Sequence, residues 1–322
     1  MTKAQHISDE FGKYIKETEY CYQTKDKTLG VSIGIEKLDE KLGYLRGGDI
    51  ILVAARPAMG KTSFAVNCSY RIAEKFKNEA KQNNSEIKQI LYFNFECNTK
   101  NMIQRFVSLT SEIPLHKLMC NAKNYEQFEK TTTSYNKINQ LPVYLCNQIS
   151  GISDIKDEIY AFANKNKLGL VVIDYLQLVS LYSDDKTDKV FKKFMQDIKS
   201  IAEKLDIPII ILSQLNRDIE QRQNKRPTLN DIRGGCDNIV PYADKVLFLY
   251  RESYYILDKE PKQYKKETKE HFEKRYNDWE NYYQELEDKC EIIIAKNSSG
   301  DCACVRCLFD RDTGKFTDLE ED

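Results

Sequence analysis

The segment from Ala55 to Thr62 constrains this chain most, and it reads Ala-Arg-Pro-Ala-Met-Gly-Lys-Thr. It directly follows the apolar run Ile50 to Ala54 and leads into a helical stretch. A strand that turns through Gly-Lys-Thr into a helix has the geometry of a phosphate-binding P-loop, because backbone N–H groups of the turn and of the helix N-terminus point at the anion. The sequence therefore predicts a nucleoside triphosphatase.

Individual residues of this loop have expected roles. Lys61 is expected to reach the β- and γ-phosphates, and the Thr62 hydroxyl to ligate Mg²⁺. Ala55 stands where the pattern usually has its first glycine, so the strict motif fails by one methyl group. The alternative is a turn with an incidental lysine, but strand, turn and helix follow in the required order. The residues predicted to bind the nucleotide are Ala55, Arg56, Pro57, Ala58, Met59, Gly60, Lys61, Thr62 and Ser63.

The composition is that of a globular protein, with 322 residues of which 41% are apolar and 31% charged. The net charge of −1 shows no overall bias toward nucleic acid, so contact with DNA has to come from local basic clusters. The ten cysteines do not form two Cys-x-x-Cys units spaced as in a zinc site, so we expect reduced thiols rather than disulfides or a zinc site. The sequence shows no signal peptide and no long apolar span, which predicts a soluble cytoplasmic protein without membrane contact.

Apolar runs alternate with helical stretches over most of the chain. Residues 3–20 predict an amphipathic helix followed by a charged linker, and together residues 1–28 are expected to precede the main domain at 29–322. Continuous apolar runs predict strands buried on both faces of a mainly parallel sheet in an α/β fold. Residues 261–289 are rich in Lys, Glu and Tyr and predict a solvated helix or helical hairpin inserted between two strands. The predicted strands are 50–54, 90–95, 142–145, 168–173, 207–212, 245–250, 291–295 and 303–309.

Polar side chains stand at the ends of three of these strands. Asp174 stands at the end of an apolar strand. P-loop enzymes hold Mg²⁺ with the help of an aspartate in this position, so Asp174 is expected to assist Mg²⁺. Glu96 follows a second strand and is expected to polarise the attacking water, although it also suits the start of a helix near Thr99. Gln214 ends a third strand and is expected to sense the γ-phosphate, unless it is an edge residue with no role. Carboxyl ends of parallel strands gather at one edge of the sheet, beside a bound nucleotide.

The stretch after Gln214 is polar, basic and contains glycine, which predicts a surface loop carrying cations. It includes Arg217, Arg222, Arg233 and Gly234. A solvated charged segment is the simpler interpretation. Its position directly after a strand end near the nucleotide favours a loop that hydrolysis can move.

Several motifs taken together resemble the C-terminal motor domain of DnaB-type replicative helicases. The resemblance covers residues 29 to 255 and 290 to 319, in order. It implies a RecA-like fold, a homohexameric ring, ATP with Mg²⁺ at each subunit interface, and 5′-to-3′ translocation along single-stranded DNA. The motifs that carry it are ARPAMGKT, FNFE, VVIDYLQL, ILSQLNRDIEQRQNKRPTLNDIR, ADKVLFLYRESYY and EIIIAK.

The resemblance also implies roles for residues. Lys61 and Thr62 would bind phosphate and Mg²⁺, Asp174 would assist Mg²⁺, and Glu96 would be the catalytic carboxylate. Gln214 would be the sensor, and Lys296 would act across the subunit interface. The predicted DNA-binding residues are Arg217, Arg222, Arg233 and Gly234, and the helix at 3–20 would dock on the neighbouring subunit.

The chain departs from the family pattern in three ways. No collar domain is expected before residue 29, and the insertion 261–289 replaces a short connection. Ser298 stands where the family usually has an arginine that reaches the neighbour's γ-phosphate. An arginine finger accelerates turnover about 10³- to 10⁵-fold in other P-loop enzymes, so either another cation substitutes or hydrolysis is slow.

We therefore predict an ATP-dependent DNA helicase of the DnaB type that acts in DNA replication, with a primase or a helicase loader as further partner. Two alternatives stay open. One is a DNA-binding ATPase that does not unwind, such as a loader, a remodeller or a defence component. The other is an assembly ATPase similar to RecA or KaiC, which the basic stretch after Gln214 disfavours.

Overall fold

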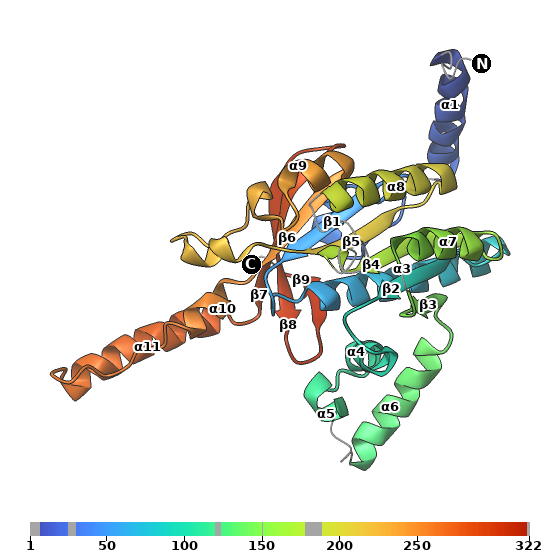
Figure 1. Cartoon of the computed structure of the whole chain (residues 1–322). Helices are drawn as coiled ribbons and strands as arrows, with labels where there is room; N and C mark the ends of the chain where they lie inside the picture. Colours follow the sequence, from blue (N-terminus) through green and yellow to red (C-terminus); the bar gives the residue numbers. More distant parts are fainter. Residues whose placement is uncertain (1–6, 25–29, 120–123, 150, 178–188, 321–322) are drawn as a thin grey trace.

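The computed structural model describes residues 7–24, 30–119, 124–149, 151–177 and 189–320. Its centre is a nine-stranded sheet in the order β3-β2-β4-β5-β1-β6-β7-β8-β9 (Figure 1). The strands are β1 (Ile50–Ala55), β2 (Gln89–Asn94), β3 (Val143–Cys146), β4 (Leu168–Asp174), β5 (Ile209–Gln214), β6 (Lys245–Tyr250), β7 (Lys289–Asn297), β8 (Ala303–Asp310) and β9 (Lys315–Asp318).

The first six strands pair in parallel, and β7, β8 and β9 extend the sheet from β6 in antiparallel fashion. The central strand β1 is buried along its whole length, as are nearly all residues of β4 and β5. Such strands need apolar side chains on both faces, which is why they appear as uninterrupted apolar runs. The predicted α/β class with a mainly parallel sheet is confirmed, whereas the short strand β9 was not predicted.

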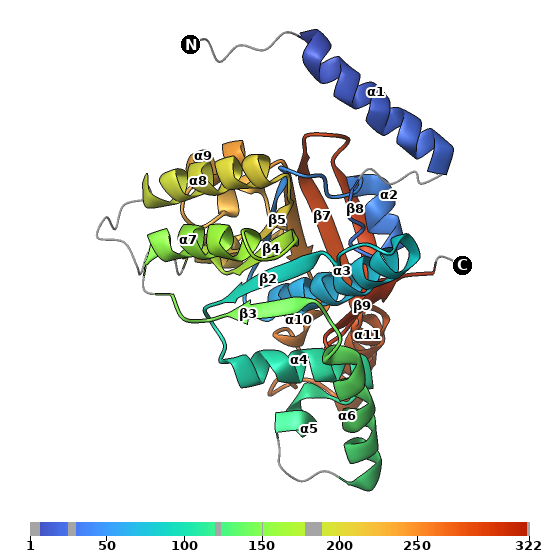
Figure 2. The same cartoon turned by 90° about the vertical axis from the view of Figure 1, so that its right-hand side faces the viewer.

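Helices cover both faces of the sheet (Figure 2). Phe64 and Phe76 of α3 pack on one face, and Phe194 and Ile198 of α8 pack on the other. The α-helices are α1 (Ile7–Thr24), α2 (Glu36–Leu42), α3 (Lys61–Asn83), α4 (Thr99–Ser111), α5 (Leu115–Met119), α6 (Tyr125–Ile138), α7 (Ile152–Ala163), α8 (Lys189–Leu205), α9 (Cys236–Ile239), α10 (Glu252–Leu257) and α11 (Lys269–Leu286). Three 3-10 helices are η2 (Arg217–Gln221), η3 (Leu229–Asp231) and η4 (Val240–Tyr242).

Two helices project from the body of the molecule. The first, α1, begins at Ile7 and ends at Thr24, whereas the predicted helix spanned residues 3–20. Residues 3–6 of that prediction, and residues 25–28 of the predicted linker, lie outside the described residues. The second, α11, is the helix predicted in the insertion, and none of its 18 residues is fully buried. It points away from the sheet edge in Figure 1.

Two further properties concern the chain as a whole. Among the described residues, no helix combines the length and the apolar character needed to cross a lipid bilayer. The cysteines whose side chains the structure describes are free thiols, and Cys290 and Cys307 lie opposite each other on β7 and β8.

Candidate functional site

The P-loop turn depends on a glycine that packs against an aromatic ring. Gly60 has a left-handed backbone with φ of 91°, and α3 begins at the next residue, Lys61. A Cβ atom at Gly60 would lie 2.8 Å from the Phe309 ring of β8, so a larger residue does not fit. Ala55, by contrast, is the buried last residue of β1 and has no positive φ. An alanine is therefore tolerated there without backbone strain.

A cleft of about 520 Å³ opens beside this turn, at the carboxyl edge of the parallel strands. It brings together the sequence-predicted Lys61, Glu96 and Gln214. Five cationic side chains line it against a single carboxylate, which favours a polyanionic ligand. The lining residues are Arg56, Pro57, Ala58, Gly60, Lys61, Thr62, Ser63, Glu96, Arg105, Gln214, Arg251, Tyr254, Leu257, Phe309 and Arg311.

Two of the predicted nucleotide-binding residues do not line the cleft, and a third, Arg56, lines it and also braces the loop. Ala55 and Met59 are buried and do not line the cleft. The Arg56 guanidinium turns toward the loop after β5, where it pairs with Glu220 at 2.8 Å and donates to the Leu215 carbonyl at 3.0 Å. Arg56 thus ties the P-loop to the loop that follows β5.

Asp174 ends β4 and is fully buried beside the P-loop. Its Oδ2 accepts a hydrogen bond from the Tyr92 hydroxyl at 3.2 Å, while its Oδ1 is buried without a partner. Burial raises the pKa of Asp174 to about 6, although the Lys61 charge and the Thr62 hydroxyl oppose that rise. A buried carboxylate oxygen without a partner, close to a threonine hydroxyl, fits the oxygen ligands that Mg²⁺ prefers.

Lys61 shows the reciprocal effect. Burial lowers the pKa of its ammonium, and the negative charges of Asp174 and Glu96 raise it in part. Its Nζ lies 4.9 Å from the centre of the Tyr175 ring. A desolvated ammonium that faces two carboxylates gains much from the arrival of phosphate oxygens, because the interior screens their charge only weakly.

Glu96 has a position in the cleft that its alternative role does not explain. The N-cap of α4 is Asn98, whose side chain accepts from the Asn101 N–H at 2.8 Å. Glu96 is therefore not needed as the helix-capping acid. Its side chain instead lines the cleft that contains Lys61.

Gln214 connects the cleft to the loop that follows β5. Its side-chain oxygen accepts a hydrogen bond from Arg233 Nη1 at 3.2 Å. Gln177, which sequence reasoning did not single out, reinforces this link: its amide nitrogen donates to the Arg233 carbonyl, and its oxygen accepts from the Gln214 N–H, both at 2.8 Å. Gln214 is thus not an edge residue without contacts.

The four predicted DNA-binding residues have different surroundings. Arg217 and Arg233 are exposed. Gly234 has φ of 104°, and a Cβ there would lie 2.7 Å from the Phe191 ring, so it shapes the loop. Arg222 is half-buried and pairs with Asp231 at 2.8 Å. The Arg222 guanidinium therefore braces the loop from within, and contact with DNA through it stays a prediction.

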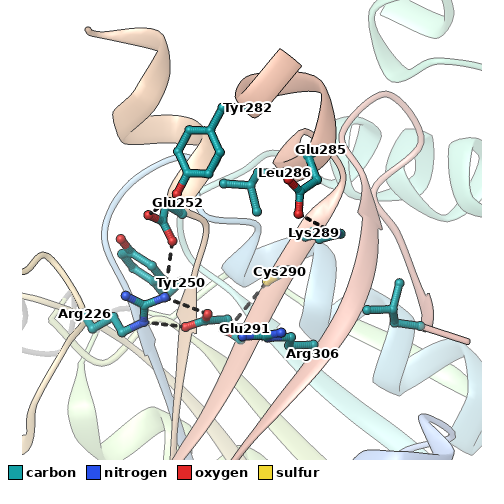
Figure 3. Close-up of a pocket in the computed structure, with 11 residues that line it drawn as sticks. Arg226, Tyr250, Glu252, Tyr282, Glu285, Leu286, Lys289, Cys290, Glu291 and Arg306 are labelled. Carbon is teal, nitrogen blue, oxygen red and sulfur yellow. Dashed lines mark hydrogen bonds and ion pairs between the residues drawn. The ribbon is translucent and has the colours of Figure 1, made fainter. Parts of the chain in front are cut away.

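Arg226 anchors the same loop to the rest of the domain (Figure 3). It forms two hydrogen bonds of 2.8 Å with Glu291 of β7 and an ion pair of 3.3 Å with Glu252 of α10. Its guanidinium also lies 5.0 Å from the centre of the Tyr250 ring. These contacts border a hollow of about 250 Å³ at the base of α11.

Lys296 lies outside the cleft of its own chain. Its ammonium donates to the Val240 and Ala243 carbonyls, at 2.9 and 2.6 Å. Ser298, where the resemblance would place an arginine, donates through its hydroxyl to the Asp244 carbonyl at 2.9 Å. A role for Lys296 in a neighbouring subunit therefore stays a prediction.

Sequence reasoning missed six residues that line the cleft: Arg105, Arg251, Tyr254, Leu257, Phe309 and Arg311. Arg251 is buried, its guanidinium lies 5.0 Å from the centre of the Phe309 ring, and its Nε has no partner. The Nε of Arg105 is likewise buried without a partner. Arg251 directly follows β6, so its place at the end of a predicted strand was a signal that could have found it. Only tertiary structure brings Arg105, Phe309 and Arg311 to the P-loop, so no local pattern marks these three.

Comparisons with known proteins point to one family. A family model described as the DnaB-like helicase C terminal domain matches residues 30–318. Replicative DNA helicases DnaB of Rickettsia bellii (strain RML369-C) and Geobacillus stearothermophilus are 33% identical over 304 residues and 30% identical over 319 residues. These alignments cover 92% and 98% of this chain, which spans 59% and 62% of the length of those relatives.

Two solved structures share the fold. One, described as an ATPase domain, matches with a TM-score of 0.77 and 25% identity, covering 99% of this chain and 100% of that one. The structure of a DnaB-like replicative helicase and its interactions with primase gives a TM-score of 0.75 and 26% identity, covering 99% of this chain and 68% of that one.

The sheet order, the P-loop and its cleft define a P-loop nucleotide-binding domain with the RecA-like fold. Within that class, the chain belongs to the DnaB-like helicase C-terminal domain family. The resemblance drawn from its motifs is confirmed.

The raised pKa of Asp174 predicts a pH-dependent stability in protein free of nucleotide and metal. Because the folded pKa of about 6 exceeds the ordinary value of 3.8, ionising Asp174 destabilises the fold, and this cost fades as the pH falls below 6. Asp174→Asn removes the charge and should stabilise the protein by about 3 kcal/mol at pH 8, and by about half of that at pH 5. Urea unfolding at both pH values tests this, and a difference that does not change with pH contradicts it.

Proposed function

We propose that this chain is the motor of an ATP-dependent DNA helicase of the DnaB type. In this proposal it assembles as a hexameric ring, hydrolyses ATP with Mg²⁺, translocates along single-stranded DNA and unwinds duplex DNA during replication. Family membership supports this function, as do the replicative DNA helicases among the relatives. Movement in the 5′-to-3′ direction, a cytoplasmic location and a primase or helicase loader as partner belong to the same proposal.

One observation carries the proposal. Gln214 lines the cleft with Lys61, and its side chain also accepts a hydrogen bond from the exposed Arg233. A single side chain thus contacts both the nucleotide cleft and the loop expected to bind DNA. A change at the γ-phosphate that moves Gln214 reaches the loop through this hydrogen bond.

The geometry also supports a reaction sequence. Lys61 compensates charge on the β- and γ-phosphates, and Mg²⁺ held by Thr62 and Asp174 would neutralise more of it when bound. The Glu96 carboxylate acts as general base, accepting a proton from the water that attacks the γ-phosphate. Gln214 then responds to the loss of the γ-phosphate.

Strand displacement tests this function directly. The wild-type protein should release a labelled strand from a forked duplex with ATP, and should not do so with a slowly hydrolysed analogue. Glu96→Gln should bind nucleotide normally but lose at least about 100-fold in turnover and unwinding, because an amide cannot accept the proton. Normal hydrolysis by Glu96→Gln would assign the carboxylate a structural role.

A DNA contact through phosphates is expected from the loop after β5. Arg217 and Arg233 are exposed there, and among the described residues the Arg217 side chain has no hydrogen-bond partner. Positive side chains that contact phosphates give an affinity that falls with salt, with a slope of about 0.7 per contact for single strands. Such contacts carry no base information, so binding should be similar for all sequences.

Arg233→Ala should weaken binding to single-stranded DNA and reduce the slope of log affinity against log salt by about 0.7. It should also remove stimulation of ATP hydrolysis by DNA, because the hydrogen bond to Gln214 is lost. Arg46→Ala is the matched control, since Arg46 is exposed just before β1, at the amino edge of the sheet. Fluorescence anisotropy at several salt concentrations measures both variants, and equal slopes for them would rule out the loop contact.

Two apolar faces support assembly into a ring. On α1, Ile7, Phe11 and Tyr14 are 81%, 59% and 58% exposed. On α6, Tyr125 and Phe128 are 75% and 61% exposed. The two helices lie at opposite ends of the molecule in Figures 1 and 2, so they cannot cover each other within one chain. Contact between different faces of successive copies is heterologous, and such a contact generates a ring where the rotation between copies closes.

Phe11→Asp should abolish the assembly while leaving each chain folded, because the Phe11 side chain is 59% exposed in its own chain. Lys16→Asp serves as control, since residue 16 lies on the opposite side of α1 from residues 7, 11 and 14. Light scattering in the presence of ATP and Mg²⁺ gives the oligomeric state. Monomers in wild type would contradict the ring, whereas hexamers in both variants would contradict the contribution of Phe11 to it.

A DNA-binding ATPase that does not unwind is the second candidate, and the surroundings of Ser298 favour it. Both the N–H and the hydroxyl of Ser298 donate to the Asp244 carbonyl, and its side chain carries no positive charge. Without the expected arginine, hydrolysis is slow unless another cation substitutes. The strand-displacement experiment separates the two candidates.

A further inference from the structure

The inserted helix α11 is attached to the nucleotide cleft through its last turn. Glu287 follows α11 directly, and it holds two different arginines that line the cleft. Its carboxylate accepts from Arg311 at 2.8 Å, and its backbone carbonyl accepts from Arg251 at 3.4 Å. Arg251 also donates to the carbonyl of Ala58 in the P-loop, at 3.4 Å. The insertion is therefore in contact with the cleft, although it projects from the body.

Arg311 is held on one side only. Its Nη2 donates to Glu287 and to the Tyr283 hydroxyl of α11, the latter at 3.2 Å. Its other guanidinium nitrogens have no hydrogen-bond partner in the part of the chain that the structure describes. The side chain is 41% exposed and lines the cleft. Three N–H groups are thus left to face a ligand.

The position of Arg311 along the cleft indicates which part of a nucleotide it faces. It shares a second, smaller hollow with Ser63 and Gly314. A Cβ at Gly314 would lie 3.0 Å from the Ser63 hydroxyl, so the turn after Arg311 packs against the first turn of α3. The backbone of a P-loop surrounds the α- and β-phosphates of the nucleotide, whereas its lysine reaches the β- and γ-phosphates.

We propose that Arg311 contacts the α- or β-phosphate of the bound nucleotide, and that α11 positions it through Tyr283 and Glu287. Arg311 adds a cation to the cleft from a segment that the P-loop motif does not include. The inference rests on the proposed function in one respect, since it takes the ligand to be a nucleotide. An exposed pair such as Arg311 with Glu287 stabilises a fold by little, so positioning is the larger consequence of the contact.

Nucleotide binding without hydrolysis tests the inference. We would measure the affinities for Mg·ADP and for a slowly hydrolysed ATP analogue by calorimetry, on the full chain. Arg311→Gln should weaken both affinities equally, by about fivefold, because both ligands carry the α- and β-phosphates. Arg311→Lys should retain most of the affinity, because it keeps the charge. The loss for Arg311→Gln should shrink at high salt.

Arg275→Gln is the matched control within the insertion. Arg275 also pairs with a glutamate, Glu267, at 2.7 Å, but does not line the cleft. This variant should keep the wild-type affinity for both ligands. Thermal unfolding of each variant shows whether the fold is intact.

The outcomes separate this inference from the proposed function. If the wild type binds nucleotide and Lys61→Ala does not, the P-loop site stands. Unchanged affinity of Arg311→Gln in that situation would overturn the role of Arg311 alone. A loss confined to the ATP analogue would also overturn it, since the contact would then be with the γ-phosphate. If the wild type binds neither ligand, the proposed function itself fails.

Discussion

The parallel pairing of β2, β4, β5 and β1 is the constraint on which the rest of this structure depends. Parallel strands end at one edge, so the register that pairs Ala55 with Gln214 and Asn94 with Asp174 also brings the P-loop, the acidic residues and the Gln214 amide together. Each strand needs apolar residues on both faces to be buried in such a sheet. The same apolar runs therefore build the core and determine where the polar residues at their ends meet.

Burial at that edge prepares the charges of the site before any ligand arrives. Asp174 and Lys61 are both desolvated, and burial moves their pKa values toward each other, the acid upward and the base downward. Each group in its charged form is stabilised mainly by the other. A phosphate beside the lysine and a divalent cation beside the carboxylate would offset the cost of burying these two charges. The free energy spent on that burial during folding would then favour binding.

Much of this arrangement was predictable from sequence, because its parts are local. The P-loop, the strand ends at Asp174 and Gln214 and the solvated insertion all have short-range patterns. The pairing of Arg222 with Asp231 inside the loop was not predictable, because an arginine in a polar stretch looks solvated. Arg311 was missed because only the antiparallel return of β7 and β8 brings it to the P-loop. Arg251 was missed although it directly follows β6, which pairs in parallel with β1. The short strand β9 was not predicted, because its four residues are too few to show the alternation of apolar and polar side chains that marks a strand.

The packing of Phe309 against Gly60 has a consequence for how the domain is made. These two residues lie near the two ends of the described domain, and the aromatic ring forms one wall of the nucleotide cleft. A chain emerging from a ribosome completes the P-loop strand and α3 early, but it lacks that wall until β8 has been synthesised. The cleft is therefore complete only when almost the whole sheet is present, so the proposed nucleotide binding would begin late in the synthesis of the chain.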